Sequence, residues 1–309
     1  MGRLQGVDVL RADQFTRDEL DEIMGRARDF SAALERGDRM DTMAGNILAT
    51  LFYEPSTRTR LSFETAMLRL GGQVVSVAEP KSSSAAKGES LPDTIRTVEG
   101  YADIIVLRHP MVGSAEEAAS ATDRPVINAG DGAGQHPTQA LLDLYTISRE
   151  KGKVDGLTVT LAGDLKHGRT VHSLAQVLSR YEVNLQLASP AELKMPSEIV
   201  KRVREAGLTV EETEDLASSL AKSDVLYMTR VQRERFSDPQ AYERLKGVFV
   251  LTRAMLQGAR GKVTLMHPLP RVDEIAPEVD DLPEAAYFRQ AANGVPVRMA
   301  LLALIAGQA

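Results

Sequence analysis

The stretch from residue 46 to residue 70 reads NILATLFYEPSTRTRLSFETAMLRL. Its first part, Asn46–Tyr53, is a short and mostly apolar run, which is typical of a buried strand. Its last part, Arg60–Leu70, has apolar residues at the i, i+4 and i+7 spacing of one helix face. A strand that passes through a polar turn into a helix is the repeating unit of parallel α/β sheets.

The same alternation continues along the chain. Helices are predicted at Thr170–Arg180 and at Pro137–Lys151, where Pro137 suits a helix start and Gly152 a helix end. The expected fold class is α/β, with two doubly wound parallel-sheet domains joined by the long helix. Further strands are predicted at Val74–Val77, Ile104–Leu107, Val126–Asn128, Leu157–Ala162, Asn184–Ala188, Val225–Met228, Val248–Leu251 and Val263–Met266.

Two domains are also expected from the length of 309 residues. We place the first at residues 1–150 with a C-terminal helix at 288–309, and the second at 151–287. The C-terminal helix is expected because Val297–Ile305 is apolar at helical spacing, and it is expected to pack back on the first domain. Two polar stretches, 79–91 and 230–246, are predicted to be loops.

The composition restricts the class of protein. Hydrophobic residues make up 43% and charged residues 26% of the chain, which is ordinary for a globular protein. The net charge of −6 disfavours nucleic acid as a partner, and the absence of cysteine excludes disulfides and thiolate chemistry. No apolar run approaches the roughly 20 residues of a membrane span, and the first residues lack a signal-peptide core, so a cytoplasmic protein is expected.

The turn Ser56-Thr57-Arg58-Thr59-Arg60 is a candidate anion site. The first amides of a helix have no intrahelical acceptor, and the helix dipole favours an anion beside them. Threonine hydroxyls add donors, and the guanidinium of Arg58 suits a phosphate. The alternative is an ordinary serine cap with surface arginines, but two threonines interleaved with two arginines favour the anion site. The spacing of a Walker phosphate loop is missing.

Polar groups follow the next two predicted strands as well. Arg108 follows Ile104–Leu107, while His136 and Gln139 open the long helix after Val126–Asn128. The glycines at 130–134 permit a close backbone approach to a ligand. Adjacent parallel strands would bring all these groups into one cleft.

The second half repeats this arrangement with different residues. Arg169 and Arg230 follow two strands and suit the two carboxylates of a dicarboxylic acid. They could instead be solvated, or paired with Asp164 and Glu234, although surface pairs contribute only about 0–1 kcal/mol. The single glycine after Leu157–Ala162 is too little for a dinucleotide site. The histidines form no ligand motif, so no metal is predicted.

Together these motifs resemble the aspartate/ornithine carbamoyltransferase family. Ornithine-specific members carry His-Cys-Leu-Pro and a Ser-Met-Gly loop, whereas this chain has His267-Pro268-Leu269-Pro270 and the Lys87 loop typical of the aspartate branch. The matching segments follow the family's order over nearly the whole chain: Ser56–Arg60, Lys87–Ser90, Arg108–Pro110, His136–Gln139, Gly168–Leu174, Met228–Gln232 and His267–Arg271.

The resemblance implies transfer of the carbamoyl group of carbamoyl phosphate to the amino group of L-aspartate, an early step of pyrimidine synthesis. It also implies a homotrimer with shared active sites, to which the neighbouring subunit contributes Ser83 and Lys87, and in some members regulatory chains. No cofactor or metal is implied.

The implied site residues are distributed over both domains. The catalytic residues would be Arg58, Thr59, Lys87, Arg108 and His136. Carbamoyl phosphate would be bound by Ser56, Thr57, Arg58, Thr59, Ser83, Arg108, His136, Gln139 and the backbone of Leu269 and Pro270, and aspartate by Lys87, Arg169, Arg230 and Gln232.

Three alternatives stay open at this point. The acceptor could be another amine such as ornithine, for which Arg169 and Arg230 are poor partners because ornithine brings a cation. The chain could be a non-catalytic anion-binding homologue. A nucleotide-dependent oxidoreductase is disfavoured by the missing glycine fingerprint.

Overall fold

The computed structural model describes residues 2–78, 84–232, 238–245, 247–257, 259 and 263–308. The chain forms two compact units. Unit 1 comprises Met1–Tyr145 and Asn293–Ala309, and unit 2 comprises Thr146–Ala292. The division falls within helix α5 (Pro137–Lys151) and again within helix α11 (Tyr287–Ile305).

Unit 1 is built on a parallel sheet. Its strands lie in the order β2 (Gln73–Val77), β1 (Ile47–Phe52), β3 (Ile104–His109) and β4 (Val126–Asp131). The inner strand β3 is buried from Ile104 to Arg108, in keeping with its apolar run Ile104–Leu107, and β4 is buried along its whole length.

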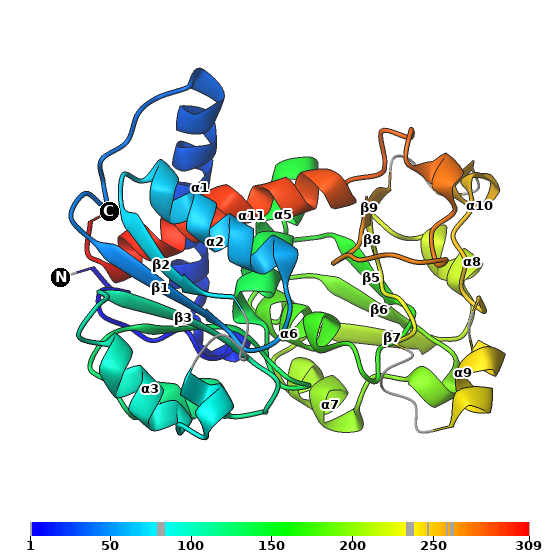
Figure 1. Cartoon of the computed structure of the whole chain (residues 1–309). Helices are drawn as coiled ribbons and strands as arrows, with labels where there is room; N and C mark the ends of the chain where they lie inside the picture. The colour runs from blue at the N-terminus through cyan, green and yellow to red at the C-terminus, as the bar shows by residue number, and fades with distance from the viewer. Residues whose placement is uncertain are drawn as a thin grey trace. The chain divides into compact units, whose positions relative to one another are not determined.

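Helices cover both faces of this sheet (Figure 1). On one face, Ala49 and Leu51 of β1 pack with Ile95 and Ala118 of the helices below the sheet. On the other face, Thr50 donates a hydrogen bond to Glu64 of the helix above, with 3.0 Å between the oxygens. The helices of unit 1, besides the shared α5 and α11, are α1 (Arg17–Arg36), α2 (Thr57–Arg69), α3 (Leu91–Val98) and α4 (Ser114–Ala119).

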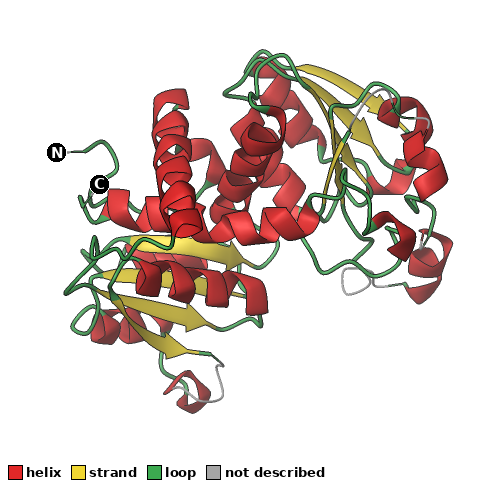
Figure 2. Ribbon diagram, turned by 90° about the horizontal axis from the view of Figure 1, so that it is seen from above, coloured by secondary structure: helices red, strands yellow, loops and turns green. Residues whose placement is uncertain are grey.

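Unit 2 contains a second parallel sheet, which lies between helices in Figure 2. Its strands lie in the order β7 (Thr209–Thr213), β6 (Asn184–Ala188), β5 (Thr158–Ala162), β8 (Val225–Met228) and β9 (Thr264–Met266). Its helices are α6 (Arg169–Leu178), α7 (Ser197–Glu205), α8 (Leu216–Leu220), α9 (Pro239–Leu245) and α10 (Arg253–Gln257).

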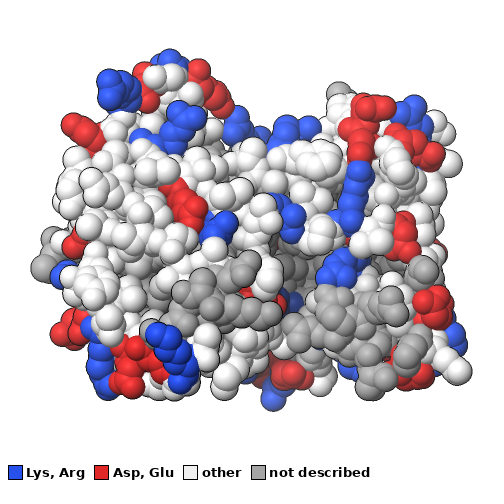
Figure 3. Space-filling model, in the orientation of Figure 1, with Lys and Arg blue, Asp and Glu red and all other residues white. Residues whose placement is uncertain are grey.

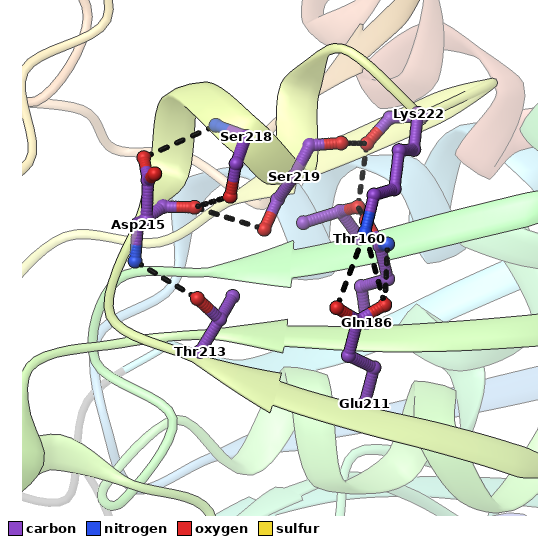
Figure 4. Close-up of polar contacts among 9 residues, drawn as sticks. Thr160, Gln186, Glu211, Thr213, Asp215, Ser218, Ser219 and Lys222 are labelled. Carbon is purple, nitrogen blue, oxygen red and sulfur yellow. Dashed lines mark hydrogen bonds and ion pairs between the residues drawn. The ribbon is translucent and has the colours of Figure 1, made fainter.

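One face of this second sheet carries a polar ladder toward its β7 edge (Figure 4). Thr160, Gln186 and Glu211 are register partners on β5, β6 and β7, so their side chains project from the same face. Thr160 donates to Gln186 (2.9 Å), and Gln186 donates to Glu211 (3.1 Å). Lys222 then pairs with Glu211 (3.2 Å) at the exposed end. The ladder satisfies polar side chains that would otherwise be costly beneath α8.

The fold class expected from the sequence is confirmed, and most predicted elements are present with small changes in length. Two predicted elements were wrong, and one strand was missed. Val248–Leu251 is not a strand, because only Leu251 forms an isolated bridge, to Ile275. The segment 230–246 was predicted to be a loop, but Pro239–Leu245 is helix α9. The edge strand β7 was not predicted at all.

The surface carries charges of both signs. On the face drawn in Figure 3, acidic and basic side chains are interspersed over each unit, in keeping with the small net charge of −6. None of the described helices is both long enough and apolar enough to cross a bilayer.

Candidate functional site

Arg108 connects the ends of three adjacent strands in unit 1. It is the fifth residue of β3, not a residue after the strand as predicted, and it pairs in register with Phe52. Its guanidinium forms an ion pair with Glu54 after β1 (2.9 Å) and donates to the carbonyl of Ala129 in β4 (3.1 Å). With 9% of its surface exposed, it presents a largely desolvated cation at this edge of the sheet. Such a cation binds an anion more strongly than a solvated one does.

Helix α2 begins beside this edge, at the predicted anion turn. Ser56 is the N-cap residue of α2, but among the described residues its side chain makes no capping hydrogen bond. The backbone N–H groups of Thr57, Arg58 and Thr59 form the first turn of α2, where amides have no intrahelical acceptor. The helix start therefore offers both hydroxyl and amide donors.

Arg58 is the arginine of this turn that is available to a ligand. No described residue forms a hydrogen bond or an ion pair with its guanidinium, whereas Arg60 lies 3.9 Å from Glu64. The side chain is exposed at the surface, yet partial desolvation by the surrounding protein lowers its pKa. An arginine that is partly desolvated without an acidic partner is a favourable site for an anion.

The loop after β4 leads to His136 and Gln139. The glycines of this loop were predicted to admit a ligand, but Gly132 instead admits the protein's own backbone. A Cβ at Gly132 would lie 2.2 Å from the carbonyl oxygen of Pro110, at a φ of +57°. The loop is held further by Asp131, whose carboxylate accepts from the backbone N–H groups of Gln135 (2.6 Å) and Gly113 (3.0 Å). His136, 4% exposed, then precedes α5.

Gln139 is oriented by an acidic residue one turn further along α5. Its amide donates to Asp143 with 2.8 Å between the atoms. Nearby in unit 1 is Arg298 of α11, which is buried, donates to the Gly294 carbonyl (3.2 Å) and stacks over the ring of Phe63 in α2 (4.8 Å). Burial lowers the pKa of Arg298 to about 10, against the opposing effect of Asp143. Two charged residues of unit 1 thus contact these elements: Asp143 contacts Gln139, and Arg298 contacts α2 through Phe63.

In unit 2, the loops after β5 and β8 are bonded to each other. Asp164, fully buried after β5, accepts from the backbone N–H groups of His167 (3.0 Å) and Gln232 (3.4 Å). The Gln232 side chain donates in return to the His167 carbonyl (3.2 Å). Gln232 is therefore held beside the loop that leads to Arg169, the first residue of α6.

Gly163 and Thr229 show how closely these strand ends approach. A Cβ at Gly163 would lie 2.3 Å from the Thr229 carbonyl oxygen, and φ is +106°. Arg230 follows Thr229 directly, so the close approach sets where Arg230 leaves the sheet. Asp164, the partner considered for Arg169, accepts from the backbone of this loop. Glu234, the proposed partner of Arg230, lies outside the described residues.

The loop after β9 carries Leu269 and Pro270. Leu269 has a φ of +51°, and the Leu269–Pro270 peptide bond is cis. Arg271 ends the motif, where it pairs with Asp280, donates to the Tyr287 hydroxyl (3.1 Å) and lies over the Tyr287 ring. Because β5, β8 and β9 are adjacent, Arg169, Arg230 with Gln232, and Leu269 with Pro270 follow neighbouring strands of one sheet.

Two predicted site residues lie in the polar stretch 79–91. Lys87 is exposed and ends a short 3₁₀ helix, Ser84–Lys87, before α3. Ser83 lies outside the described residues. Over the part of the chain that is described, no three or more acidic or histidine side chains gather to hold a metal ion.

The family model for the carbamoyl-P binding domain of aspartate/ornithine carbamoyltransferases matches residues 8–149. The model for the Asp/Orn binding domain of the same family matches residues 155–305. The chain belongs to the aspartate/ornithine carbamoyltransferase family. The resemblance noted in the sequence is thereby confirmed.

Members of the carbamoyltransferase family are similar to this chain over its full length. The aspartate carbamoyltransferase catalytic subunit of Methanopyrus kandleri is 56% identical over 301 residues, which cover 97% of each chain. Aspartate transcarbamoylase of Trypanosoma cruzi, solved with carbamoyl phosphate and aspartate, matches with a TM-score of 0.94 at 42% identity and 98% coverage of both chains. The catalytic subunit of M. jannaschii aspartate transcarbamoylase matches with a TM-score of 0.89 at 51% identity and 96% coverage of both chains.

Within this carbamoyltransferase chain, sequence reasoning missed the residues that orient the predicted ones. Glu54, the ion-pair partner of Arg108, lies just after β1 and so has a detectable position at a strand end. Asp143 follows Gln139 at i+4 on a predicted helix, a spacing that brings side chains together. Glu274, bonded to His267, has no local pattern that would reveal it.

Proposed function

We propose that this chain transfers the carbamoyl group of carbamoyl phosphate to the amino group of L-aspartate. The products are N-carbamoyl-L-aspartate and phosphate. The observation that carries the proposal is the convergence of an unpartnered Arg58, the open start of α2 and Arg108 at one edge of the unit 1 sheet. The relatives named aspartate carbamoyltransferase, and the T. cruzi structure with both substrates, support the same reaction.

Unit 1 binds carbamoyl phosphate in this proposal. Ser56, Thr57, Arg58 and Thr59 surround the phosphate at the start of α2. Arg108 spans the phosphate and, with Thr59 and His136, the carbonyl oxygen. Gln139, held by Asp143, accepts from the carbamoyl amine. Ser83 completes the phosphate site, although it lies outside the described residues.

Unit 2 binds L-aspartate and also contributes backbone groups. Arg169 and Arg230 pair with the two carboxylates, with Gln232 beside them. The carbonyl groups of Leu269 and Pro270 accept from the carbamoyl amine. A dicarboxylate suits two arginines on neighbouring loops, since each makes charge-assisted hydrogen bonds.

The reaction needs no covalent enzyme intermediate. The uncharged amine of aspartate attacks the carbamoyl carbon and forms a C–N bond. The C–O bond to phosphate breaks, phosphate leaves with that electron pair, and the proton released from the amine ends on it. Arg108, His136 and Thr59 stabilise the oxyanion that develops at the carbonyl, and Arg58 stabilises the departing phosphate.

The direct test is an assay of the purified protein with carbamoyl phosphate and either L-aspartate or L-ornithine. We expect carbamoyl-aspartate to form and no citrulline, because ornithine would place a cation between Arg169 and Arg230. Product from ornithine alone would keep the phosphate site and overturn the choice of acceptor. No product from either acceptor, in a folded protein, would contradict the function.

The proposal includes a homotrimer in which each active site receives Lys87, with Ser83, from a neighbouring subunit. Lys87 is exposed, as such a contribution requires. Leu61 and Leu68 of α2 and Val75 of edge strand β2 are also exposed, with 49%, 61% and 45% of their surfaces accessible. Exposed apolar residues of this kind favour a protein–protein contact. Regulatory chains, a cytoplasmic location and a place in pyrimidine synthesis belong to the same proposal.

A further inference from the structure

Unit 2 contains a buried histidine–glutamate pair behind the loop that follows β9. His267 is 1% exposed and Glu274 is 4% exposed. The Nε2 atom of His267 lies 2.6 Å from Oε1 of Glu274. Burying two such groups is costly unless their hydrogen bonds are satisfied, and a buried pair is weak support for stability alone. The pair therefore invites a functional explanation.

The hydrogen bonds of the ring determine its tautomer. The backbone N–H of Leu269 donates to Nδ1 of His267, with 2.8 Å between the nitrogens. Because Nδ1 accepts, the proton of the neutral ring is on Nε2, which donates to Glu274. Burial lowers the pKa of His267 and favours this neutral form, although Glu274 opposes the shift while Arg271 and Arg230 add to it.

Glu274 closes the loop from its other end. Its Oε2 atom accepts from the backbone N–H groups of Val272 and Asp273, each at 3.0 Å. Burial raises the pKa of Glu274, but the hydrogen bonds from His267 and the loop outweigh it, so the pKa is lowered and the group stays a carboxylate. The backbone of His267 is fixed in turn by Gln290, whose side chain accepts from it at 2.8 Å.

The residue that these bonds hold is conformationally unusual. Leu269 has a φ of +51°, the only positive φ of a non-glycine residue in the described chain. A leucine there is strained and persists only where the surroundings impose that conformation. Its N–H is bonded to His267, and the segment is tied at both ends to the buried pair.

We propose that His267 and Glu274 are positioning residues that hold the Leu269–Pro270 backbone so that its carbonyl groups accept from the carbamoyl amine. The proposal rests on the proposed function, because it assigns the pair to the binding of carbamoyl phosphate. Neither side chain needs to touch the substrate. The ring acts through its Nδ1 atom, and the carboxylate acts by fixing the ring and the far end of the loop.

Two amide variants separate the two ring nitrogens. In His267→Asn the amide reaches the position of Nδ1 and can still accept from Leu269, but it loses the bond to Glu274. In His267→Gln the amide reaches the position of Nε2 and can still donate to Glu274, but it leaves the Leu269 N–H without its acceptor. His267→Asn therefore keeps the hydrogen bond with Leu269, and His267→Gln keeps the hydrogen bond with Glu274.

The proposal predicts opposite orders for stability and for substrate use. His267→Gln should be the more resistant to urea, yet its KM for carbamoyl phosphate should exceed that of His267→Asn by about tenfold, the effect of one lost hydrogen bond. The KM for aspartate should be similar in the two variants. A crystal structure of His267→Gln should show Leu269 outside the left-handed region.

The contrary outcomes distinguish a failure of the positioning role from a failure of the proposed function. An active wild type whose His267→Gln variant keeps the lower carbamoyl-phosphate KM, or in which both variants share one KM, would show that the pair only stabilises the fold. Wild-type protein without carbamoyl-aspartate formation would instead overturn the proposed function, and with it the role given to the pair.

Discussion

At the scale of the residue, the structure places the candidate arginines at or near the ends of strands and helices, and it adds partners that the sequence did not predict. Arg58, Arg108 and Arg169 were identified because parallel strands direct their carboxyl ends to one edge, so that position alone indicates function. The partners could not be predicted in the same way. The pairing of Glu54 with Arg108 is recognised only once the strands are ordered, because it is a tertiary contact, whereas Asp143 lies four residues from Gln139 on the same helix. The close approach of Gly132 to Pro110 is also a tertiary contact, which the local sequence does not reveal.

A titration prediction also belongs to single residues. His172 is partly buried, and its Nε2 donates to the Leu165 carbonyl (2.7 Å). Burial lowers its pKa, outweighing that hydrogen bond and Asp164. As the pH falls, His172 is therefore protonated in the unfolded chain before it is protonated in the folded chain. The free energy of unfolding decreases as the pH drops below the unfolded pKa of about 6.5.

The variant His172→Gln should reduce this pH dependence. Its amide can keep the donor to Leu165 but does not titrate. Between pH 7.5 and 5.5, the free energy of unfolding measured in urea should fall more steeply for the wild type, by up to about 1.4 kcal/mol per pH unit. Parallel curves for the two proteins would contradict a buried, neutral His172.

At the scale of the element, apolar composition decides which strands are visible in the sequence. Strands β3, β4 and β8 are almost completely buried, so they appear as short apolar runs. Strand β7 reads TVEET, lies at the edge of its sheet and is largely exposed, so it lacks that pattern. The run Val248–Leu251 has the apolar composition of a strand, but it forms no ladder with the sheet in unit 2.

The close contact between Gly163 after β5 and Thr229 after β8 gives a prediction for these strands. In Gly163→Ala, the new Cβ would meet the Thr229 backbone at 2.3 Å, so the strand ends must separate. We expect a loss of at least about 2 kcal/mol in unfolding free energy and a raised KM for aspartate, because Arg230 moves with Thr229.

Gly207→Ala is the matched control. Gly207 has a φ of +100°, close to that of Gly163, but a Cβ there would meet nothing within 4 Å. It should show the backbone strain alone, about 1 kcal/mol, and an unchanged KM for aspartate. Equal effects of the two substitutions on the aspartate KM would exclude the contact as the cause.

At the scale of the whole molecule, the proposed homotrimer gives a prediction about which subunit's site Lys87 serves. Lys87→Ala and Arg58→Ala should each be inactive as pure trimers. If Lys87 serves the neighbouring subunit's site, a trimer reassembled from both variants contains one site with both native residues. Random mixing then restores about a quarter of wild-type activity, as expected for a heterologous ring.

The control is to keep the two variants unmixed, or to mix them without dissociating the trimers. Activity should then stay at the level of each pure variant. Reassembled trimers, verified by light scattering, that remain inactive would show that Lys87 acts in the site of its own chain.

We propose that carbamoyl phosphate is held by unit 1 through Arg58, while unit 2 selects the acceptor through Arg230. Calorimetric titration of carbamoyl phosphate into three variants tests it most directly: Arg58→Ala, Arg230→Ala, and Arg69→Ala as a control on the exposed far end of α2. We expect the affinity to be lowered by roughly tenfold to a hundredfold in Arg58→Ala alone, the effect of losing a charged hydrogen bond. Unchanged affinity in Arg58→Ala, or an equal loss in Arg230→Ala, would contradict it.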